Sequence, residues 1–371
     1  MRNMSDSYEV RFAEDGEEKQ IVDLLSSIFF EWKARGDKAI DHWYWMYKDN
    51  PIGPCNIVVS VYKDDVVGVA HDFHTYFKIG DDIRKTLYGT DVAVHLEHRR
   101  KGLHNRMTEF RKKHREGFGF HYGYSTNKIL IDRSIRKRKE GDDPAFLFPV
   151  DINRYLLVHD VDLHLEKKEV DQAWIKKQGY IIQQLSSKVR SSFFGSMREN
   201  GDLEIITNEN FDDVEAFWDT IKSKYDVITK KDQQYLRWRF CDKRAGEYYI
   251  FSARMNGVFY GYVVASIDHE NPTYPMGNII DFLTLGDSGR DLYLLQESLN
   301  YLSEMGINAF NVYAVKGSHM SQLLMSMGFI DRGDTMYTTY KIPDLPGEPH
   351  PVIEVSNENK IHLMYSDFYV K

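Results

Sequence analysis

The sequence predicts an α+β fold, a mixed-sheet α/β arrangement, built as two tandem domains that each hold a central twisted mixed sheet flanked by helices. Three observations support this prediction. The chain has 371 residues, whereas a single hydrophobic core stops growing at about 250–300 residues. One short motif recurs 193 residues apart. Both halves also show the same alternation of strand-like and helix-like segments.

The repeat joins two copies of a W-x-aromatic-x-D motif, Trp45–Asp49 and Trp238–Asp242. A strand, a polar turn, a second strand and a glycine follow each copy. One ungapped register relates residues 8–68 to residues 201–261. Solenoid repeats are about 20–50 residues long, so this longer period indicates two whole domains of one fold.

The elements of the first half follow from periodicity and turn signals. The turn Gly80-Asp81-Asp82 separates two long apolar strands and predicts a hairpin. In chain order, the predicted elements are a strand around Val10 and Phe12, a helix at 21–28, a helical segment at 45–49, a strand at 57–61, hairpin strands at 66–77 and 83–94, a helix at 102–115, a strand at 119–124 and a helix at 128–139.

These segments divide the chain into four predicted parts. We expect a first domain at residues 1–160, a connecting segment at 161–200, a second domain at 201–342 and a C-terminal tail at 343–371. The tail begins as a proline-rich connector. Its apolar run Val352–Val355 could add an edge strand.

Composition excludes several classes of protein. The formal net charge is −8, which is not typical of a general nucleic-acid binder. Two cysteines, Cys55 and Cys241, do not make a disulfide framework or a zinc site. The N-terminal stretch lacks the apolar region of a signal peptide, and no apolar run reaches membrane-spanning length. We therefore expect a cytoplasmic protein without a membrane partner, of unknown oligomeric state.

The run Val94–His104 is the sharpest local signal, because it lies where a strand ends and a helix begins. The first N–H groups of a helix have no intrahelical partner, and with the helix dipole they form an anion site suited to pyrophosphate. Gly102 removes the Cβ that would hold a phosphate away from the backbone. Arg99, Arg100 and Lys101 add positive charge for the phosphates.

This run resembles motif A of the GNAT superfamily of acyl-CoA-dependent N-acyltransferases, whose core reads R/Q-x-x-G-x-G/A. Arg99, Gly102 and His104 occupy the three defining positions, although His104 replaces the last small residue. The resemblance implies a loop that holds the pyrophosphate of acetyl-CoA or another acyl-CoA. It also implies that a strand binds the pantetheine arm. The cofactor-binding residues that it implies are Val92, Ala93, Val94, Arg99, Arg100, Lys101, Gly102, Leu103, His104 and Asn127.

The second half resembles the same family but lacks motif A. It carries Gly286–Leu292 at the corresponding place, with an Asp at the helix start that would repel phosphate. The sequence Met327-Gly328-Phe329 is similar to a family pattern near the domain end. We expect this degenerate domain to be structural or to form one wall of the acceptor site.

Catalytic residues are harder to assign. Many family members carry a tyrosine seven residues after the Asn, but Ser134 stands there. We consider Asp91 as a base, yet Asp281 occupies a similar place in the degenerate half, which favours a structural role for both. Tyr88 and Tyr124 are the other catalytic candidates, and each could equally be an ordinary strand aromatic. Glu97 is a comparable candidate but more readily interpreted as a solvated loop residue.

No metal site is expected. His71 and His74, and likewise His95 and His98, are spaced as H-x-x-H, which on a strand directs the two rings to opposite faces.

Residues 99–139 are rich in Lys and Arg. They could bind the 3′-phosphate of CoA or an RNA backbone, or simply form solvated helix faces.

The leading hypothesis for function is an N-acyltransferase that moves an acyl group from acyl-CoA to an amine, with a small-molecule acceptor in the space between the domains. One alternative is a peptidyltransferase-like enzyme that uses aminoacyl-tRNA. The other is a non-catalytic module that binds acyl-CoA or another ligand.

Overall fold

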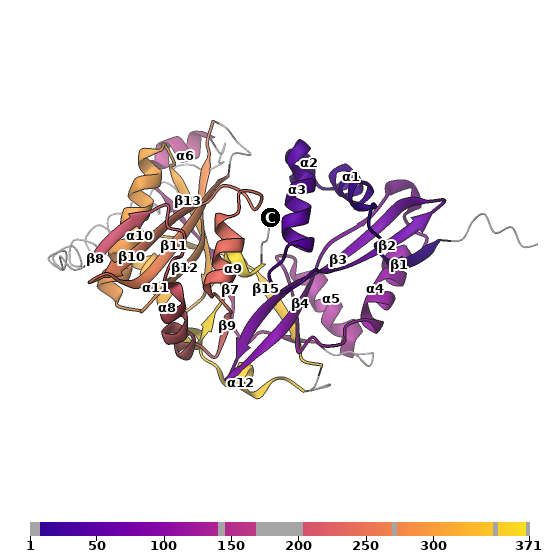
Figure 1. Cartoon of the computed structure of the whole chain (residues 1–371). Helices are drawn as coiled ribbons and strands as arrows, with labels where there is room; N and C mark the ends of the chain where they lie inside the picture. Colours follow the sequence, from indigo (N-terminus) through magenta and orange to yellow (C-terminus); the bar gives the residue numbers. More distant parts are fainter. Residues whose placement is uncertain (1–7, 140–144, 168–202, 269–272, 344–347, 369–371) are drawn as a thin grey trace, which may run out of the picture.

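The computed structural model describes residues 8–139, 145–167, 203–268, 273–343 and 348–368. Two mixed sheets with helices on their faces lie next to each other, one in each lobe of the molecule (Figure 1). The predicted α+β fold with two tandem sheets is therefore confirmed.

The first sheet has the order β1-β2-β3-β4-β5-β15-β6, and β9 and β16 join it through β3. Neighbouring strands are antiparallel except for β4 with β5 and β9 with β16, which are parallel. The strands are β1 (Glu9–Phe12), β2 (Asn56–Tyr62), β3 (Asp65–Ile79), β4 (Asp82–Val94), β5 (Phe120–Ser125), β15 (Tyr337–Lys341), β6 (Phe146–Leu147), β9 (Val227–Thr229) and β16 (Ile361–His362).

The second sheet repeats this plan in the order β14-β7-β13-β12-β11-β10-β8. Its one parallel pair is β12 with β13, the counterpart of β4 with β5. The strands are β14 (Ile330–Thr335), β7 (Ile152–Val158), β13 (Ala309–Val315), β12 (Met276–Thr284), β11 (Val258–Asp268), β10 (Tyr249–Met255) and β8 (Leu203–Thr207).

The two sheets exchange one strand. β7 comes from the first half of the chain but lies between β13 and β14 of the second sheet. β15 comes from the second half but lies between β5 and β6 of the first sheet. The domain boundary at residue 160 stays a prediction. The sheets do not follow it, because β7 precedes residue 160 but belongs to the second sheet, and β15 follows it but belongs to the first. Each lobe needs a strand from the other.

Helices cover both sheets, and their apolar faces point inward. In α1, Ile21, Leu24 and Leu25 are buried, as their helical spacing predicts. The helices are α1 (Glu18–Ile28), α2 (Phe30–Ala34), α3 (Ala39–Trp43), α4 (Leu103–Lys113), α5 (Lys128–Lys139), α6 (Val161–Lys167), α8 (Val214–Ile221), α9 (Gln233–Leu236), α10 (Ser288–Glu304), α11 (His319–Ser326), α12 (Pro351–Val355) and α13 (Tyr365–Phe368).

The repeated W-x-aromatic-x-D motif forms the junction between the lobes. Both copies adopt a π-helical turn, at Tyr44–Lys48 and Arg237–Cys241. Trp45 Nε1 donates to the Trp238 carbonyl at 2.9 Å, and Trp238 Nε1 donates to the Trp45 carbonyl at 3.1 Å. The two rings stack with centroids 4.8 Å apart. The repeat therefore creates a contact with approximate twofold symmetry.

The prediction of an edge strand in the tail is wrong. Pro351–Val355 is the short helix α12, because Pro351 stands in the first helical turn and the His350 side chain accepts from the Val352 N–H. The tail forms its strand later, at β16, which pairs with β9.

Candidate functional site

The strands β4 and β5 separate toward their carboxyl ends. Their parallel pairing runs only from Thr86 opposite Phe120 to Tyr88 opposite Tyr122. In the part of the chain that the structure describes, β4 then continues to Val94 and β5 to Ser125 without pairing to each other. Backbone N–H and C=O groups on this side of β4 are therefore available to another hydrogen-bonding partner.

A bulge re-directs β4 where the strands part. Its register with β3 shifts between the Val69–Ala93 and His71–Thr90 pairs, and Asp91 has a φ of +46°. The Asp91 carboxylate is buried and accepts hydrogen bonds from Trp32 Nε1, at 3.1 Å, and from the Tyr47 hydroxyl. Because both oxygens already have donors, the geometry favours the structural role over the role of a base.

His71 fixes the same bulge from β3, a role that no local sequence motif indicates. Its Nε2 accepts from Trp43 Nε1 at 3.0 Å, so its Nδ1 carries the proton and donates to the Asp91 carbonyl at 3.1 Å. Burial lowers the pKa of His71 to about 4, which keeps the ring neutral. Only the fold, not a local motif, brings these residues together.

Tyr88 and Tyr124 lie on either side of the point where the strands part. Their rings stack with centroids 5.1 Å apart, and their hydroxyls hydrogen-bond to each other. Burial raises the pKa of Tyr88 to about 12 and the pKa of Tyr124 well above 10. Both hydroxyls are therefore protonated at neutral pH and can donate a proton or a hydrogen bond.

The loop after β4 leads into α4, as the sequence predicts. Gly102 has a φ of +76° and precedes the helix, and a Cβ there would meet no atom within 4 Å. No side chain of the described residues caps this end of α4, and its first turn has no acidic residue. The first N–H groups of α4 therefore have no side-chain acceptor among the described residues and can bind an anion.

The remaining predicted cofactor residues surround that turn. Arg99, Arg100 and Lys101 are exposed, and Arg99 Nε donates to the Val94 carbonyl at 3.2 Å. Leu103 is buried and anchors the helix, whereas His104 is exposed. Val92 and Ala93 lie on the end of β4 that pairs with β3 but not with β5.

Asn127 lies directly before α5. Its side-chain oxygen accepts from the Ile129 N–H at 3.1 Å, so this atom stabilises the helix start. The cofactor role of Asn127 stays a prediction.

A family model described as an acetyltransferase (GNAT) domain matches residues 9–127, which contain the bulge, the unpaired end of β4 and the loop. The match supports the GNAT superfamily for this part of the chain. None of the curated proteins has a matching sequence.

Solved structures share the fold of this chain at low identity. A probable N-acyltransferase of Enterococcus faecalis is 10% identical, with a TM-score of 0.58, and the match covers 91% of this chain and 72% of that one. A GCN5-related N-acetyltransferase of Kribbella flavida is 10% identical, with a TM-score of 0.57, and the match covers 92% of this chain and 72% of that one. An N-myristoyltransferase of Saccharomyces cerevisiae with bound myristoyl-CoA is 11% identical, with a TM-score of 0.55, and the match covers 98% of this chain and 86% of that one.

The turn that precedes the loop before α4 contradicts the argument that His95 and His98 point to opposite faces of a strand. His95 and His98 are not on a strand, because Leu96–His98 forms a 3-10 turn. Ligand atoms of His95, Glu97 and His98 lie within 4.8 Å of one another. His98 Nδ1 already bonds to the Tyr8 hydroxyl at 2.9 Å. The argument from opposite strand faces is therefore wrong for this pair, while the absence of a metal stays a prediction.

The C-terminal tail reaches β5, which the sequence did not reveal. The Tyr122 hydroxyl donates to the Asp367 carbonyl at 3.2 Å, and Phe368 packs edge-on against Tyr124. Next to them, a polar cavity of about 590 Å³ extends from the end of β5 to the second sheet. Thr126, Lys128, Arg154, Asn311, Tyr337 and Tyr365 are among the residues that line it.

No helix among the described residues has both the length and the apolar character needed to cross a membrane.

Proposed function

We propose that the protein is an N-acyltransferase that moves an acyl group from acetyl-CoA or another acyl-CoA to an amine. The observation that carries this proposal is the exposed, uncapped start of α4 at the end of the unpaired part of β4. A pyrophosphate fits the helix start because Gly102 offers no side chain and three cationic residues precede it. The amide-bearing pantetheine arm of the cofactor fits the edge of β4 that β5 leaves unpaired.

In the proposed reaction, the amine nitrogen attacks the thioester carbonyl, a C–N bond forms and the C–S bond breaks. The amine loses a proton to solvent, and the departing thiolate takes one. The Tyr124 hydroxyl is suited to donate that proton, because it lies just beyond the last paired residues of β4 and β5 and its raised pKa keeps it protonated. Asp91 acts in this scheme as a positioning residue, since it holds the bulge through Trp32 and Tyr47.

The acceptor amine would enter from the polar cavity of about 590 Å³. Its charged lining residues balance, with Lys128 and Arg154 against Asp268 and Asp334, and hydroxyl and amide groups supply most of the rest. These features support a polar acceptor that is recognised by many hydrogen bonds, rather than an apolar or strongly charged one.

Isothermal titration with acetyl-CoA tests the cofactor. We expect the parent protein to bind and a Gly102→Glu variant to lose about 100-fold in affinity, or about 2.7 kcal/mol, because a carboxylate would occupy the phosphate site. Gly257→Glu is the matched control. Gly257 has a φ of +78° against +76° for Gly102, and neither has an atom within 4 Å of an added Cβ. The two substitutions therefore impose the same backbone strain.

Turnover with a panel of amines, followed by release of free thiol, tests the reaction. A folded parent that binds neither acetyl-CoA nor longer acyl-CoAs would overturn the proposal, and aminoacyl-tRNA would be the next donor to test. If the protein binds acyl-CoA but turns over with none of the amines, it is a binding module and not an enzyme.

A further inference from the structure

The polar cavity of about 590 Å³ takes its lining from both lobes. Thr126 follows β5, two residues beyond Tyr124, and Tyr337 of β15 pairs with the intervening Ser125. Arg154 belongs to β7, the other exchanged strand. The cavity therefore joins the second sheet to the end of β5, next to the place that we assign to the reaction.

One face of the second sheet supplies four of the lining residues. Asn278 stands opposite Asn311 in the pairing of β12 with β13, and Tyr313 stands opposite Arg154 in the pairing of β13 with β7. Opposite residues, and residues two apart on one strand, share a face of a sheet, so these four side chains lie on one face. Val312, between two of them, belongs to the apolar core on the other face.

The side chains on this polar face hold one another in place. Arg154 Nε donates to Asp334 at 2.9 Å, and its Nη1 donates to Asn311 Oδ1 at 3.2 Å. Asn311 Nδ2 in turn donates to Asn278 Oδ1 at 3.3 Å. The Asn278 side chain is thus fixed before a ligand arrives, which reduces the entropy lost on binding.

Donors and acceptors remain available beside this network. Among the described residues, Asn278 Nδ2 and the hydroxyls of Tyr313 and Tyr337 make no hydrogen bond. The amide group donates, whereas each phenolic hydroxyl both donates and accepts. A ligand hydroxyl can also do both, so it can pair with any of these three groups.

Three tyrosine rings line the same cavity. Tyr313 and Tyr365 stack with their centroids 5.4 Å apart, and the Lys128 ammonium lies 5.9 Å from the centroid of Tyr337. All three rings are half-buried. An aromatic ring is apolar on its face, so it can cover C–H groups of a ligand and exclude water from them. The lining therefore combines apolar faces with amide and hydroxyl groups.

The charged residues of the lining already have partners. Arg154 is paired with Asp334, and Lys128 contacts Asp132 at 3.2 Å. Asp268 also has an interaction partner. A phosphorylated acceptor is best held by cations without other partners, and a polyamine by carboxylates without other partners. The lining favours neither.

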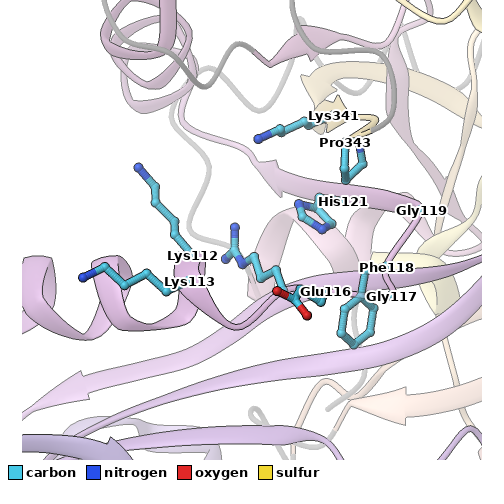
Figure 2. Close-up of a pocket in the computed structure, with 10 residues that line it drawn as sticks. Lys112, Lys113, Glu116, Gly117, Phe118, Gly119, His121, Lys341 and Pro343 are labelled. Carbon is cyan, nitrogen blue, oxygen red and sulfur yellow. The ribbon is translucent and has the colours of Figure 1, made fainter.

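The larger cavity, of about 780 Å³, beside the carboxyl end of α4 lacks this arrangement. Its lysines on α4, Lys112 and Lys113, extend away from His121 (Figure 2). Its Phe118 ring is only 8% exposed and packs against His74. This cavity also lies at the opposite end of α4 from the loop that we assign to acyl-CoA. The smaller cavity is therefore the better place for an acceptor.

We propose that the acceptor is an amino sugar, a monosaccharide or disaccharide that carries a primary amine. This inference rests on the proposed N-acyltransferase function and names its substrate class. A sugar has apolar C–H faces, which suit the tyrosine rings, and a rim of hydroxyls, which suit the polar face of the second sheet. Its amine nitrogen becomes the amide nitrogen, and the thiolate of CoA leaves and takes a proton, as in the proposed reaction.

Turnover with saturating acetyl-CoA and three classes of amine tests this substrate class. The amines are a set of hexosamines with the amine at different carbons, the polyamine spermidine and a lysine-containing peptide. We expect kcat/KM for at least one hexosamine to exceed that for the other two classes by about 100-fold or more. A larger kcat/KM for spermidine or the peptide would overturn the amino sugar and leave the acyltransferase in place.

Two substitutions test whether the sugar binds in this cavity. Asn278→Leu removes an amide and Tyr337→Leu removes a ring, from different strands, and each should raise the KM for the best hexosamine about tenfold with kcat within about threefold of the parent. Asn300→Leu makes the first change at an exposed position of α10 outside the cavity and should leave KM unchanged. Thermal unfolding reports the stability of each variant. An unchanged KM in either folded cavity variant would contradict its role in binding, and unchanged KM in both would overturn the site.

Calorimetric titration of the hexosamines into the full chain without acyl-CoA separates this inference from the proposed function. Hexosamine binding that Asn278→Leu weakens, in a protein that binds no acyl-CoA, would overturn the acyltransferase but support the carbohydrate site. Acyl-CoA binding with turnover of another amine, and no binding of any hexosamine, would overturn the amino sugar alone.

Discussion

The two lobes contain the same strand–loop–helix unit in two different states. In the first lobe, the start of α4 has no side-chain cap among the described residues and no acidic residue in its first turn. In the second lobe, the Asp287 side chain caps α10 by accepting from the Arg290 N–H at 3.0 Å, and Asp291 follows in the first turn. The second helix start already holds carboxylates, so it has neither the free N–H groups nor the charge for a phosphate.

The strands before these helices differ in the same way. β12 and β13 also stop pairing before their ends, after Ile279 opposite Val312. However, the tail occupies the space that follows, where His362 Nε2 donates to the Phe282 carbonyl at 2.9 Å. A cavity of only about 90 Å³ remains between the strand ends and the tail. In the second lobe, the protein's own tail thus takes the place that we assign to acyl-CoA in the first.

The second lobe, whose site is filled by the tail, helps to shape the site of the first lobe. The tail that fills the second lobe continues to Asp367 and Phe368, which contact Tyr122 and Tyr124 of the first. Filling the second site therefore also builds a wall of the first.

The largest loss of stability is expected from breaking the buried ion pairs that hold the tail. Lys231 is fully buried, and its Nζ lies 2.6 Å from Asp281 and 3.4 Å from Asp367 of the tail. Lys231→Met leaves two buried carboxylates without their cation, which should lower the free energy of unfolding by about 3–5 kcal/mol. Denaturant unfolding measures this loss, with the exposed Lys316→Met as control. A loss below about 1 kcal/mol would show that the tail is not held by this ion pair.

The next prediction compares two tyrosines at equivalent positions. Tyr124 lies two residues beyond Tyr122, which pairs with Tyr88, and Tyr313 lies two residues beyond Asn311, which pairs with Asn278. Both contact the tail, through Phe368 and Tyr365. If Tyr124 is the general acid, Tyr124→Phe should lower kcat about 100-fold with unchanged affinity for acyl-CoA.

Tyr313→Phe removes the same hydroxyl from the second lobe and should leave kcat at saturating amine within about twofold of the parent, since we expect no chemistry there. Tyr313 also lines the proposed acceptor cavity, so its loss is expected in the KM for the amine and not in kcat. Equal losses in both variants would mean that the hydroxyls act through the tail instead of on the thiolate. A fully active Tyr124→Phe would remove Tyr124 from the mechanism.

Local patterns predicted the repeat and the start of α4, because both depend on neighbouring residues. The match between Trp45 and Trp238 indicated a common fold, and it also marks the contact between the lobes. Gly102 and the apolar strand before it were sufficient to predict the helix start.

The remaining features depend on partners distant in sequence. No local pattern near β7 or β15 indicates that they change sheets, because the backbone donors and acceptors of a strand do not specify which strand it pairs with. The donors to Asp91 come from Trp32 and Tyr47, and no spacing rule relates them. The turn Leu96–His98 follows the strand predicted at 83–94, so the argument from opposite strand faces did not apply to His95 and His98.

A smaller effect is expected from the cap of α10. Asp287→Ala removes the acceptor of the Arg290 N–H and should lower the free energy of unfolding by about 1 kcal/mol. It should not create acetyl-CoA binding in a protein whose first site is blocked by Gly102→Glu, because the tail still fills the second strand pair. Calorimetric binding by the double variant would show that the cap alone closes the second site.

The smallest effect concerns pH and has opposite signs in the two lobes. A hydrogen bond from His319 Nε2 to buried Asp291, at 2.8 Å, raises the pKa of His319 above 6.5. Its stabilisation is fully present below pH 6.5 and is lost as the pH rises through the raised pKa. For His71 in the first lobe, the lowered pKa of about 4 means that the unfolded chain binds more protons between pH 4 and 6.5, so acidification destabilises the fold.

We compare the free energy of unfolding of the parent with that of His319→Gln, which isolates the contribution of the His319–Asp291 pair. The parent should be more stable than the variant near pH 5.5, and this advantage should shrink by about 0.5 kcal/mol by pH 8.5. It is small because the His319 side chain is 42% exposed and solvent screens the pair. A difference that grows with pH would mean that His319 is held as the neutral ring, as His71 is. The two lobes would then share one response to acid.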